Sequence, residues 1–214
     1  MKKRGLFVTL DGGDGAGKSY QAAALRGELE SRGIPVLLCR DPGSTRLGEK
    51  IREILLQSEN VEISTVSEVF LFMAARAQMV DELILPALEE GKLVIADRFF
   101  LSTVVYQGYA GGTDPADIME VAKIAVQNRF PDLTILLDLP PEEGMARIDR
   151  PLDRMEKKGL EFHRKVRDGF LKGAELLSRN YGAKVAVIDA AQPKEAVSGQ
   201  ILDIVLRTGD EIHR

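Results

Sequence analysis

The first 20 residues contain a glycine-rich segment that can surround a polyphosphate. Residues 12–19 read GGDGAGKS and match the pattern G-x-x-x-x-G-K-[ST]. Glycines allow positive φ angles, so backbone N–H groups can converge on phosphate oxygens without side chains in the way. The lysine can reach the β- and γ-phosphates, and the serine hydroxyl can bind Mg²⁺. The predicted ATP-binding residues are Gly12, Gly13, Asp14, Gly15, Ala16, Gly17, Lys18 and Ser19.

Charged residues follow two other apolar runs that are suited to buried strands. Asp97 and Arg98 come directly after one run, and Arg40 follows another. A carboxylate beside the glycine-rich loop can organise water on Mg²⁺, so we expect Ser19 and Asp97 to form the metal site. The arginines can hold a second anionic group and offset its repulsion with the first. The alternatives are an ion pair between neighbours for Asp97 and Arg98, and a solvated surface charge for Arg40.

Two groups of side chains have the spacing of one helical face and could bind a ring-containing ligand. Phe72 and Arg76 are four residues apart, as are Ser102 and Tyr106, and Gln107 follows directly. An aromatic ring with an arginine one turn away can stack on a base and donate hydrogen bonds to its edge. A hydroxyl, a phenol and an amide together suit recognition of a small polar molecule. The alternatives are a core position for Phe72 and ordinary helix-surface polarity for the second group.

The segment from about 147 to 160 has the composition of a closing lid. Arg147, Arg150 and Arg154 are spaced to lie near one helical face if the preceding helix resumes after Pro151. An arginine delivered to a transferring phosphoryl group accelerates related reactions by ~10³–10⁵. The alternative is a solvated, charged helix end.

The order of the apolar runs predicts a scaffold that brings these residues together. Short runs rich in Val, Ile and Leu predict parallel strands at residues 5–10, 35–39, 93–96, 133–139 and 184–188. Helical patterns lie between them, at residues 18–32, 46–57, 64–90, 102–109, 115–128, 141–149, 159–180 and 193–207. We therefore predict an α/β fold of three layers (α/β/α) with a five-stranded parallel sheet, formed by residues 1–214 as a single domain. In such sheets, ligands bind beyond the carboxyl ends of the strands.

The composition limits the class of partner and the compartment. The net charge is −4 and the pI about 5.4, so no basic surface for a nucleic-acid polymer is predicted. The single cysteine, Cys39, lies in an apolar run, which is typical of a core residue in the reducing cytoplasm. The apolar run near the start is too short for a signal peptide or a membrane span. His163 and His213 show no metal-ligand spacing, and we expect both at the surface.

Taken together, these motifs resemble those of the thymidylate kinase family of the P-loop superfamily. They occur in order over about residues 5–170, as LDGGDGAGKS at 10–19, RDPGSTRLG at 40–48, FMAARAQ at 72–78, DRF at 97–99, YQG at 106–108, PDLTI at 131–135 and DRME at 153–156. The resemblance implies the reaction ATP + dTMP → ADP + dTDP, with Mg²⁺ as cofactor. It also implies a homodimer paired through helices that include the one holding Phe72.

The resemblance implies a role for each matching residue on the dTMP side. Asp14 would contact the sugar hydroxyl. Phe72 would stack under thymine, and Arg76 would donate to an exocyclic oxygen of the base. Tyr106 would crowd the 2′ position and favour deoxyribose, and Gln107 would contact the base.

The resemblance also implies which residues handle the phosphates. Arg98, together with Arg40, would hold the dTMP phosphate. Arg150 and Arg154 would be the lid arginines, because the glycine-rich loop contains no arginine. The implied catalytic residues are Lys18, Arg98, Arg150, Arg154 and Asp14.

Five positions depart from the family pattern. Ala75 stands where an acid is common, which predicts that Arg76 lacks its usual orienting partner. The other departures are Asp41 for glutamate, Ser44 for glycine, Tyr20 for a small hydroxyl residue and Phe99 for tyrosine.

Two other functions remain compatible with the same residues. The first is another nucleoside or nucleotide kinase, since acceptor specificity depends on few side chains. The second is a nucleotide-switch module, although the sequence has no N-K-x-D motif for guanine and the downstream arginines would then have no task.

Overall fold

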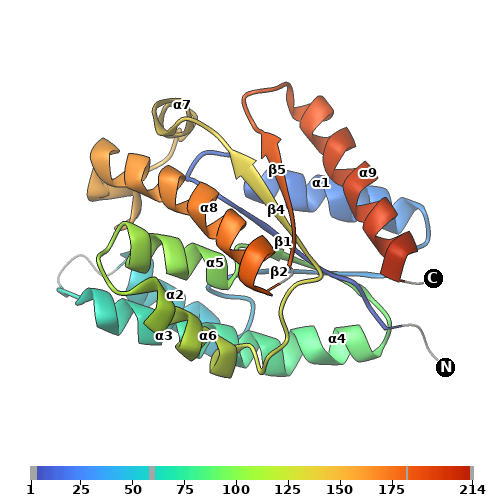
Figure 1. Cartoon of the computed structure of the whole chain (residues 1–214), viewed down its shortest axis with the longest axis horizontal. Helices are drawn as coiled ribbons and strands as arrows, with labels where there is room; N and C mark the ends of the chain where they lie inside the picture. The colour runs from blue at the N-terminus through green and yellow to red at the C-terminus, as the bar shows by residue number, and fades with distance from the viewer. Residues whose placement is uncertain (1–3, 58–60, 182, 213–214) are drawn as a thin grey trace.

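The protein, seen in a computed structural model that describes residues 4–57, 61–181 and 183–212, is built around one sheet (Figure 1). The sheet has five parallel strands in the order β2-β3-β1-β4-β5. They are β1 (Phe7–Gly12), β2 (Val36–Arg40), β3 (Leu93–Asp97), β4 (Leu133–Asp138) and β5 (Lys184–Asp189). The predicted α/β fold class and the five predicted strands are confirmed.

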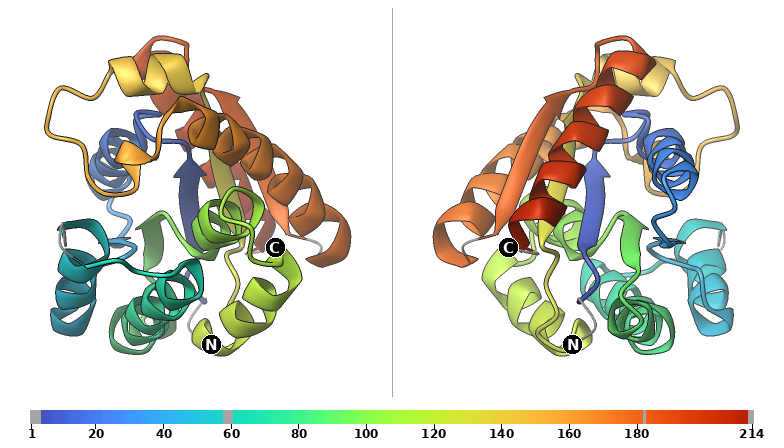
Figure 2. Two further views of the ribbon diagram at one scale, coloured as in Figure 1. Left: turned by 90° about the vertical axis from the view of Figure 1, so that its left-hand side faces the viewer. Right: turned by 90° about the vertical axis from the view of Figure 1, so that its right-hand side faces the viewer.

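Helices cover both faces of the sheet, as the two side views in Figure 2 show. One face carries α1 (Lys18–Ser31) and α9 (Lys194–Ile212), which also contact each other. The other face carries α3 (Thr65–Met79), α4 (Leu85–Glu89), α5 (Phe100–Thr103), α6 (Pro115–Ala125) and α8 (Leu160–Tyr181). Helix α2 (Arg46–Gln57) packs against α3, and the short α7 (Pro141–Ala146) packs against the start of α8. The three-layer arrangement follows from this division.

The central strand β1 is buried along its whole length and feeds two separate apolar cores. Val8 and Leu10 belong to the core under α1 and α9, whereas Phe7 belongs to the core under the opposite helices. The alternation follows from the strand period of two, which sends successive side chains to opposite faces. Cys39 is buried in the second of these cores, as predicted.

The predicted helix 64–90 is one helical stretch with a widened turn in its middle. Ser64 caps its start by accepting a hydrogen bond from the Ser67 backbone N–H. Helix α3 then passes through the π-helical turn η1 (Val80–Ile84) into α4. Pro86, at the start of α4, has no N–H to continue the α-helical hydrogen-bond ladder, which accounts for the wider turn before it.

The predicted helix 141–149 is shorter than expected and does not resume. Helix α7 ends at Ala146, and the chain is irregular up to the 3₁₀ turn η3 (Glu156–Lys158). The condition for Arg147, Arg150 and Arg154 to share one helical face, that the helix resumes after Pro151, is therefore not met. The physical reason lies in Pro151, which disfavours the helical conformation at the residue before it.

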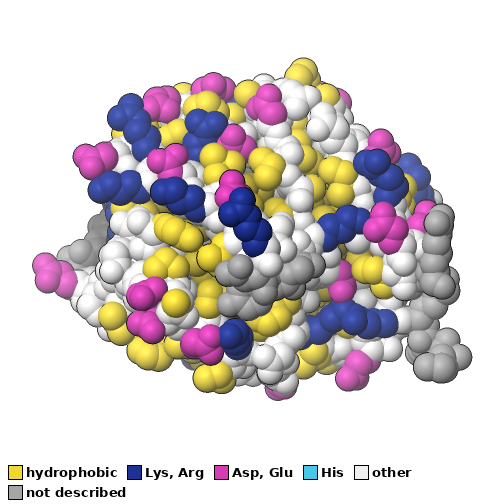
Figure 3. Space-filling view, in the orientation of Figure 1, with side chains coloured by type: hydrophobic (Ala, Val, Ile, Leu, Met, Phe, Trp, Pro, Cys, Tyr) yellow, Lys and Arg dark blue, Asp and Glu magenta, His cyan; other side chains and the backbone are white. Residues whose placement is uncertain are grey.

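The surface mixes charged and apolar groups. Figure 3 shows Lys, Arg, Asp and Glu side chains interspersed with hydrophobic ones on the face seen in Figure 1. Within the described ranges, no helix combines the length and the apolar character needed to cross a bilayer.

Candidate active site

The glycine-rich loop joins β1 to α1 and leaves the start of that helix open. Gly12, Gly15 and Gly17 have φ angles of 144°, 72° and 87°, which L side chains rarely adopt. Gly17 is the N-cap of α1 and provides no side-chain hydrogen bond to the first turn. The N–H groups and positive end of the helix therefore face the space above the loop, which suits an anionic group.

The loop is also pressed against helix α7. A Cβ atom on Gly15 would lie 1.9 Å from the carbonyl oxygen of Gly144, and a Cβ atom on Gly144 would lie 2.2 Å from the carbonyl oxygen of Asp14. Only glycine permits this approach of two backbones. The contact between the two backbones therefore fixes the loop conformation against α7.

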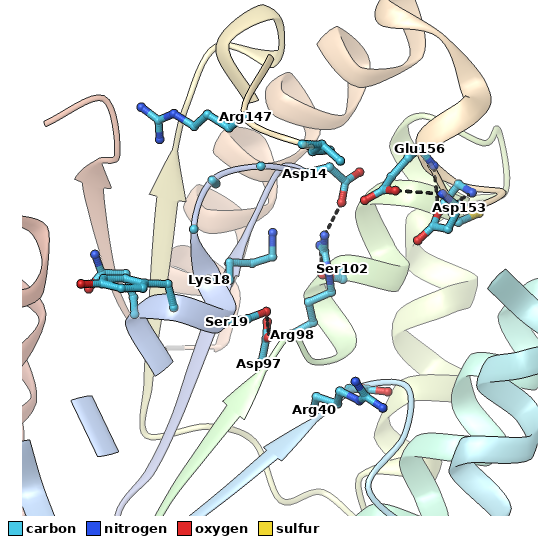
Figure 4. A pocket seen from close by; sticks show the side chains of 18 of the residues that line it. Asp14, Lys18, Ser19, Arg40, Asp97, Arg98, Ser102, Arg147, Asp153 and Glu156 are labelled. Atoms are coloured by element: carbon cyan, nitrogen blue, oxygen red, sulfur yellow. Dashed lines mark hydrogen bonds and ion pairs between the residues drawn. The ribbon is translucent and has the colours of Figure 1, made fainter. Parts of the chain in front are cut away.

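A cavity of about 960 Å³ opens beyond the carboxyl ends of the strands (Figure 4). It brings together most of the residues that the sequence predicts for the site. Its lining includes Asp14, Gly15, Ala16, Gly17, Lys18, Ser19, Arg40, Phe72, Arg76, Asp97, Arg98, Ser102, Tyr106, Gln107 and Arg150. Gly12, Gly13 and Arg154 are not among the lining residues.

The donor end of the cavity holds Lys18, Ser19 and Asp97. Lys18 donates from Nζ to the carbonyl oxygen of Gly13 at 2.5 Å, and Ser19 Oγ donates to Asp97 Oδ2 at 2.5 Å. Burial and the positive charge of Arg98 lower the pKa of Lys18 to about 8, although nearby carboxylates oppose the shift. The serine and aspartate oxygens are hard ligands of the kind that Mg²⁺ prefers, so their chemistry fits this cation.

Asp14 and Arg98 form the centre of the cavity. Arg98 Nη2 donates to Asp14 Oδ1 at 2.5 Å, and the hydroxyl of Tyr106 donates to Asp14 Oδ2 at 2.7 Å. Burial alone would raise the pKa of Asp14, but Arg98 and Lys18 outweigh it and hold the pKa below its usual value. Arg98 also donates to the carbonyl oxygen of Gly12 at 3.0 Å, and its backbone has a φ of 67°.

A second buried carboxylate lies behind this pair. Asp11 Oδ1 accepts from Ser102 Oγ at 2.7 Å, while Oδ2 has no hydrogen-bond partner among the described residues. Burial raises the pKa of Asp11, and Ser102 and Arg98 offset part of that shift. Sequence analysis assigned no role to Asp11. Its position behind Ser102 shows that it orients that hydroxyl.

Phe72 and Arg76 form one wall of the cavity with Gln107. The guanidinium of Arg76 is buried, and its Nε lies 2.5 Å from Asp41 Oδ2. Arg76 Nη2 also donates to Thr103 Oγ1 at 2.9 Å. The prediction that Arg76 lacks an orienting partner is therefore wrong: Asp41, from the end of β2, takes the place that an acid at position 75 would have.

Glu68 is a site residue that sequence analysis missed. Its buried carboxylate accepts from Gln107 Nε2 at 2.8 Å and from Arg154 Nη1 at 2.6 Å. Arg154 also donates from Nε to the carbonyl oxygen of Leu55 at 2.7 Å, so it is held against α2 and α3. The signal was present, because Glu68 precedes Phe72 by four residues and shares its helical face.

Two arginines near the end of β2 differ in what they contact. Arg40 is half-exposed and donates to Glu49 Oε2 at 2.9 Å. Arg52, on α2, donates to the carbonyl oxygen of Pro42 at 2.9 Å and lines the cavity. Sequence analysis did not single out Arg52, which lies in an ordinary charged helix pattern.

The lid arginines point in different directions. Arg147 donates to the carbonyl oxygen of Ala190 at 3.0 Å, next to the loop that follows β5. Arg150 makes two hydrogen bonds to Glu156, at 2.7 and 2.8 Å. Of the lid arginines predicted as catalytic, Arg150 therefore faces the cavity and Arg154 lies behind its wall.

His163 does not lie at the surface as predicted. It is 4% exposed, on the first turn of α8, with Nε2 3.1 Å from the carbonyl oxygen of Glu156 and Nδ1 3.6 Å from Asp14 Oδ2. Sequence spacing could not reveal this, because both contacts come from other segments. His213 lies outside the described residues.

The glycine-rich loop lies at the carboxyl edge of a parallel α/β sheet and faces a second set of arginines across one cavity. This combination defines a P-loop nucleotide kinase. A family model described as thymidylate kinase matches residues 10–201. A thymidylate kinase of Thermoanaerobacter sp. (strain X514) is 42% identical over 203 residues, which cover 94% of this chain and 98% of the relative. One from Chlamydia muridarum is 44% identical over 201 residues, which cover 92% and 97%. The chain belongs to the thymidylate kinase family.

Proposed function

We propose that this protein transfers the γ-phosphoryl group of ATP to dTMP, giving ADP and dTDP. The observation that carries the proposal is the single cavity with two different ends. One end is the phosphate loop with Lys18, and the other is the wall formed by Phe72, Arg76 and Gln107. Two nucleotides bound at these ends would meet phosphate to phosphate at Arg98.

The donor end binds the triphosphate through the loop backbone. The N–H groups of residues 12–19 and the open start of α1 surround the β- and γ-phosphates, and Lys18 places its ammonium beside them. The residues that follow β5, including Ala190 and Gln192, line the cavity beside Arg147 and border the adenine side. The position of Tyr20 at this end makes it a further donor-side contact.

The acceptor end recognises the base and the sugar separately. Phe72 offers a ring for stacking, and Arg76 offers donors fixed by Asp41. Asp14 accepts a hydrogen bond from the sugar hydroxyl, while Tyr106 stands beside it and restricts the space near the 2′ position.

Fixed positive charges lower the barrier of the transfer step. The transition state spreads negative charge over the transferring oxygens, and fixed cations stabilise it without reorganisation. Lys18 lies at the donor end of the cavity and Arg98 at its centre, with Arg40 and Arg52 on the proposed dTMP side and Arg150 at the lid. The mechanism requires no covalent intermediate.

We further propose that Ser19 and Asp97 hold Mg²⁺. A cation held there would supply positive charge that neutralises the charge developing on the transferring phosphoryl group. Asp97 orients the Ser19 hydroxyl in the present arrangement, so the two oxygens are already adjacent. We also propose that residues 147–160 act as the lid of a single domain formed by residues 1–214.

A coupled assay of ADP formation tests the function. With ATP and Mg²⁺, we expect the highest kcat/KM with dTMP and lower values with dUMP and dCMP. Lys18→Ala serves as the inactive control. Activity on thymidine without activity on dTMP would reject the proposed acceptor in favour of a nucleoside kinase.

We propose that the protein is a homodimer paired through α2 and α3. Val66 and Phe70 lie one turn apart on α3 and are 54% and 59% exposed. Leu47 and Ile54, on the α2 helix that packs against α3, are 46% and 44% exposed, and exposed apolar patches mark association sites. Phe70→Glu should give a monomer by light scattering, whereas the matched change Val187→Glu on β5 should not. A cytoplasmic location stays a prediction.

A further inference from the structure

His163 lies between two segments that the proposed mechanism treats separately. Its Nε2 faces the carbonyl oxygen of Glu156 in the lid at 3.1 Å, and its Nδ1 faces Oδ2 of Asp14 in the phosphate loop at 3.6 Å. Both neighbours are hydrogen-bond acceptors, and Nε2 lies within hydrogen-bond distance of its carbonyl while Nδ1 makes a longer polar contact with the carboxylate. The side chain does not line the large cavity. It can therefore act on substrate only through these neighbours.

Glu156 and Asp14 make further contacts, which reach the lid on one side and the acceptor end of the cavity on the other. The Glu156 carboxylate is 5% exposed and accepts both hydrogen bonds from Arg150 and one from the Asp153 backbone N–H at 2.9 Å. On the other side, Asp14 accepts from Arg98 and Tyr106. A continuous chain of contacts thus runs from the lid arginine through Glu156, the imidazole and Asp14 to the acceptor-side arginine.

The surrounding residues leave the side chains in this series of contacts little freedom to move. The backbone of Asp14 is fixed by its close approach to Gly144, so the direction of its carboxylate depends on the three side chains around it. Phe162 packs edge to face against the imidazole, with ring centroids 5.6 Å apart. The hydrogen bond at Nε2, the polar contact at Nδ1 and the Phe162 ring together fix the buried imidazole in orientation as well as in place.

We propose that His163 is a positioning residue that joins the lid to Asp14, so that Arg150 and the sugar-binding carboxylate are held in one arrangement. The inference rests on the proposed function of the cavity. It adds a residue that neither the sequence motifs nor the cavity lining identify. A residue that only filled space would need volume but no polar contact on either side.

Two variants of similar shape separate the two contacts. An asparagine amide nitrogen falls near the Nδ1 position of histidine, and a glutamine amide nitrogen falls near the Nε2 position. His163→Asn therefore keeps the contact toward Asp14, and His163→Gln keeps the contact toward Glu156. His163→Leu removes both. Leu177→Ala, at a 2% exposed position on the same helix, reports the effect of lost stability alone.

The first readout is steady-state kinetics. Misplacing a reacting group by about 1 Å can cost up to ~10² in rate, so we expect His163→Leu to lower kcat/KM for dTMP by ~10- to 100-fold. The KM for ATP should stay close to that of the wild type, and each polar variant should recover part of the loss. Leu177→Ala should lower the Tm and leave both KM values unchanged. An unaltered kcat/KM in His163→Leu, or an equal loss in Leu177→Ala, would overturn the proposal.

The second readout does not depend on the reaction. In the nucleotide-free protein, amides of residues 153–158 should exchange hydrogen faster in His163→Leu and His163→Asn than in the wild type, whereas His163→Gln, which keeps the contact toward Glu156, should exchange like the wild type. Unchanged exchange in His163→Leu and His163→Asn would overturn the link between the imidazole and the lid. If the wild type forms no dTDP, the proposed function fails, and the exchange measurement alone decides the link. The Asn and Gln variants keep both readouts available if the leucine variant does not fold.

Discussion

Removing the Asp41 carboxylate should destabilise the protein strongly. Asp41 and Arg76 are each 1% exposed at the side chain and meet at 2.5 Å. Removing one partner of a buried ion pair costs about 3–5 kcal/mol, because the other charge stays buried without compensation. In Asp41→Ala, Arg76 would keep only Thr103 Oγ1 and the Phe99 carbonyl as oxygen acceptors. We expect a loss of about 3–5 kcal/mol, against a typical total of ~5–15 kcal/mol.

Urea unfolding at constant m value measures the loss. Glu30→Ala is the matched control, because its pair with Arg26 is exposed (50% and 43%) and such pairs contribute about 0.3–0.5 kcal/mol. The double variant Asp41→Leu/Arg76→Met should recover stability relative to Asp41→Ala, since no buried charge remains. A loss below about 1 kcal/mol in Asp41→Ala would refute the reasoning, because it would mean that water or another group neutralises the buried guanidinium.

Further outcomes follow from the cavity, its loop and helix α9. Phe72→Ala should weaken dTMP binding by about 1–3 kcal/mol, the usual value of base stacking, and leave ATP binding nearly unchanged; equal losses in calorimetry would mean that the ring only supports the fold. The pKa of Lys18 is about 8 against an ordinary 10.5, and a bound anionic nucleotide should raise it again. ATP binding at pH 8 should therefore take up about half a proton, as measured in buffers of different ionisation enthalpy. Because the unfolded chain binds more protons than the folded one between these two pKa values, the same group should add stability as the pH rises from 8 toward 10.5. Gly144→Ala should disturb the phosphate loop and reduce ATP affinity, because its Cβ would meet the Asp14 carbonyl oxygen. Gly199→Ala has open space at its Cβ and should stabilise α9 by about 0.5–1 kcal/mol in thermal unfolding. Arg150→Ala should lower turnover more than it raises the KM for dTMP, and an unaltered turnover would remove this arginine from the mechanism.

The features that the sequence predicts well are those that local patterns determine. The strands, the glycine-rich loop and the pairing of Phe72 with Arg76 on one face each depend on residues within a few positions of one another. The cavity then follows from topology, because the carboxyl ends of parallel strands meet at one edge of the sheet. The register confirms this, since Arg40 pairs with Asp97 and Leu10 pairs with the same residue from the other side.

The features that the sequence does not predict depend on contacts between distant segments. Asp41 reaches Arg76 across 35 positions, and Glu68 reaches Arg154 across 86. No spacing rule connects such pairs, because helix packing and the path of the irregular lid decide which side chains meet. His163 was misplaced for the same reason, since a polar residue near a helix start is ordinarily solvated.

Helix α1 is preceded by Gly17, an N-cap residue that offers its first turn no side chain for capping. Glycine at such a position costs a helix only about a few tenths of a kcal/mol relative to serine or aspartate, but it leaves the N–H groups of the first turn without a side-chain acceptor. A bound phosphate supplies the missing acceptor, so part of the native state is completed by its own substrate. Since a ligand at a hundred times its Kd adds about 2.7 kcal/mol of apparent stability, the folded lifetime of this enzyme should track the energy charge of the cell that contains it.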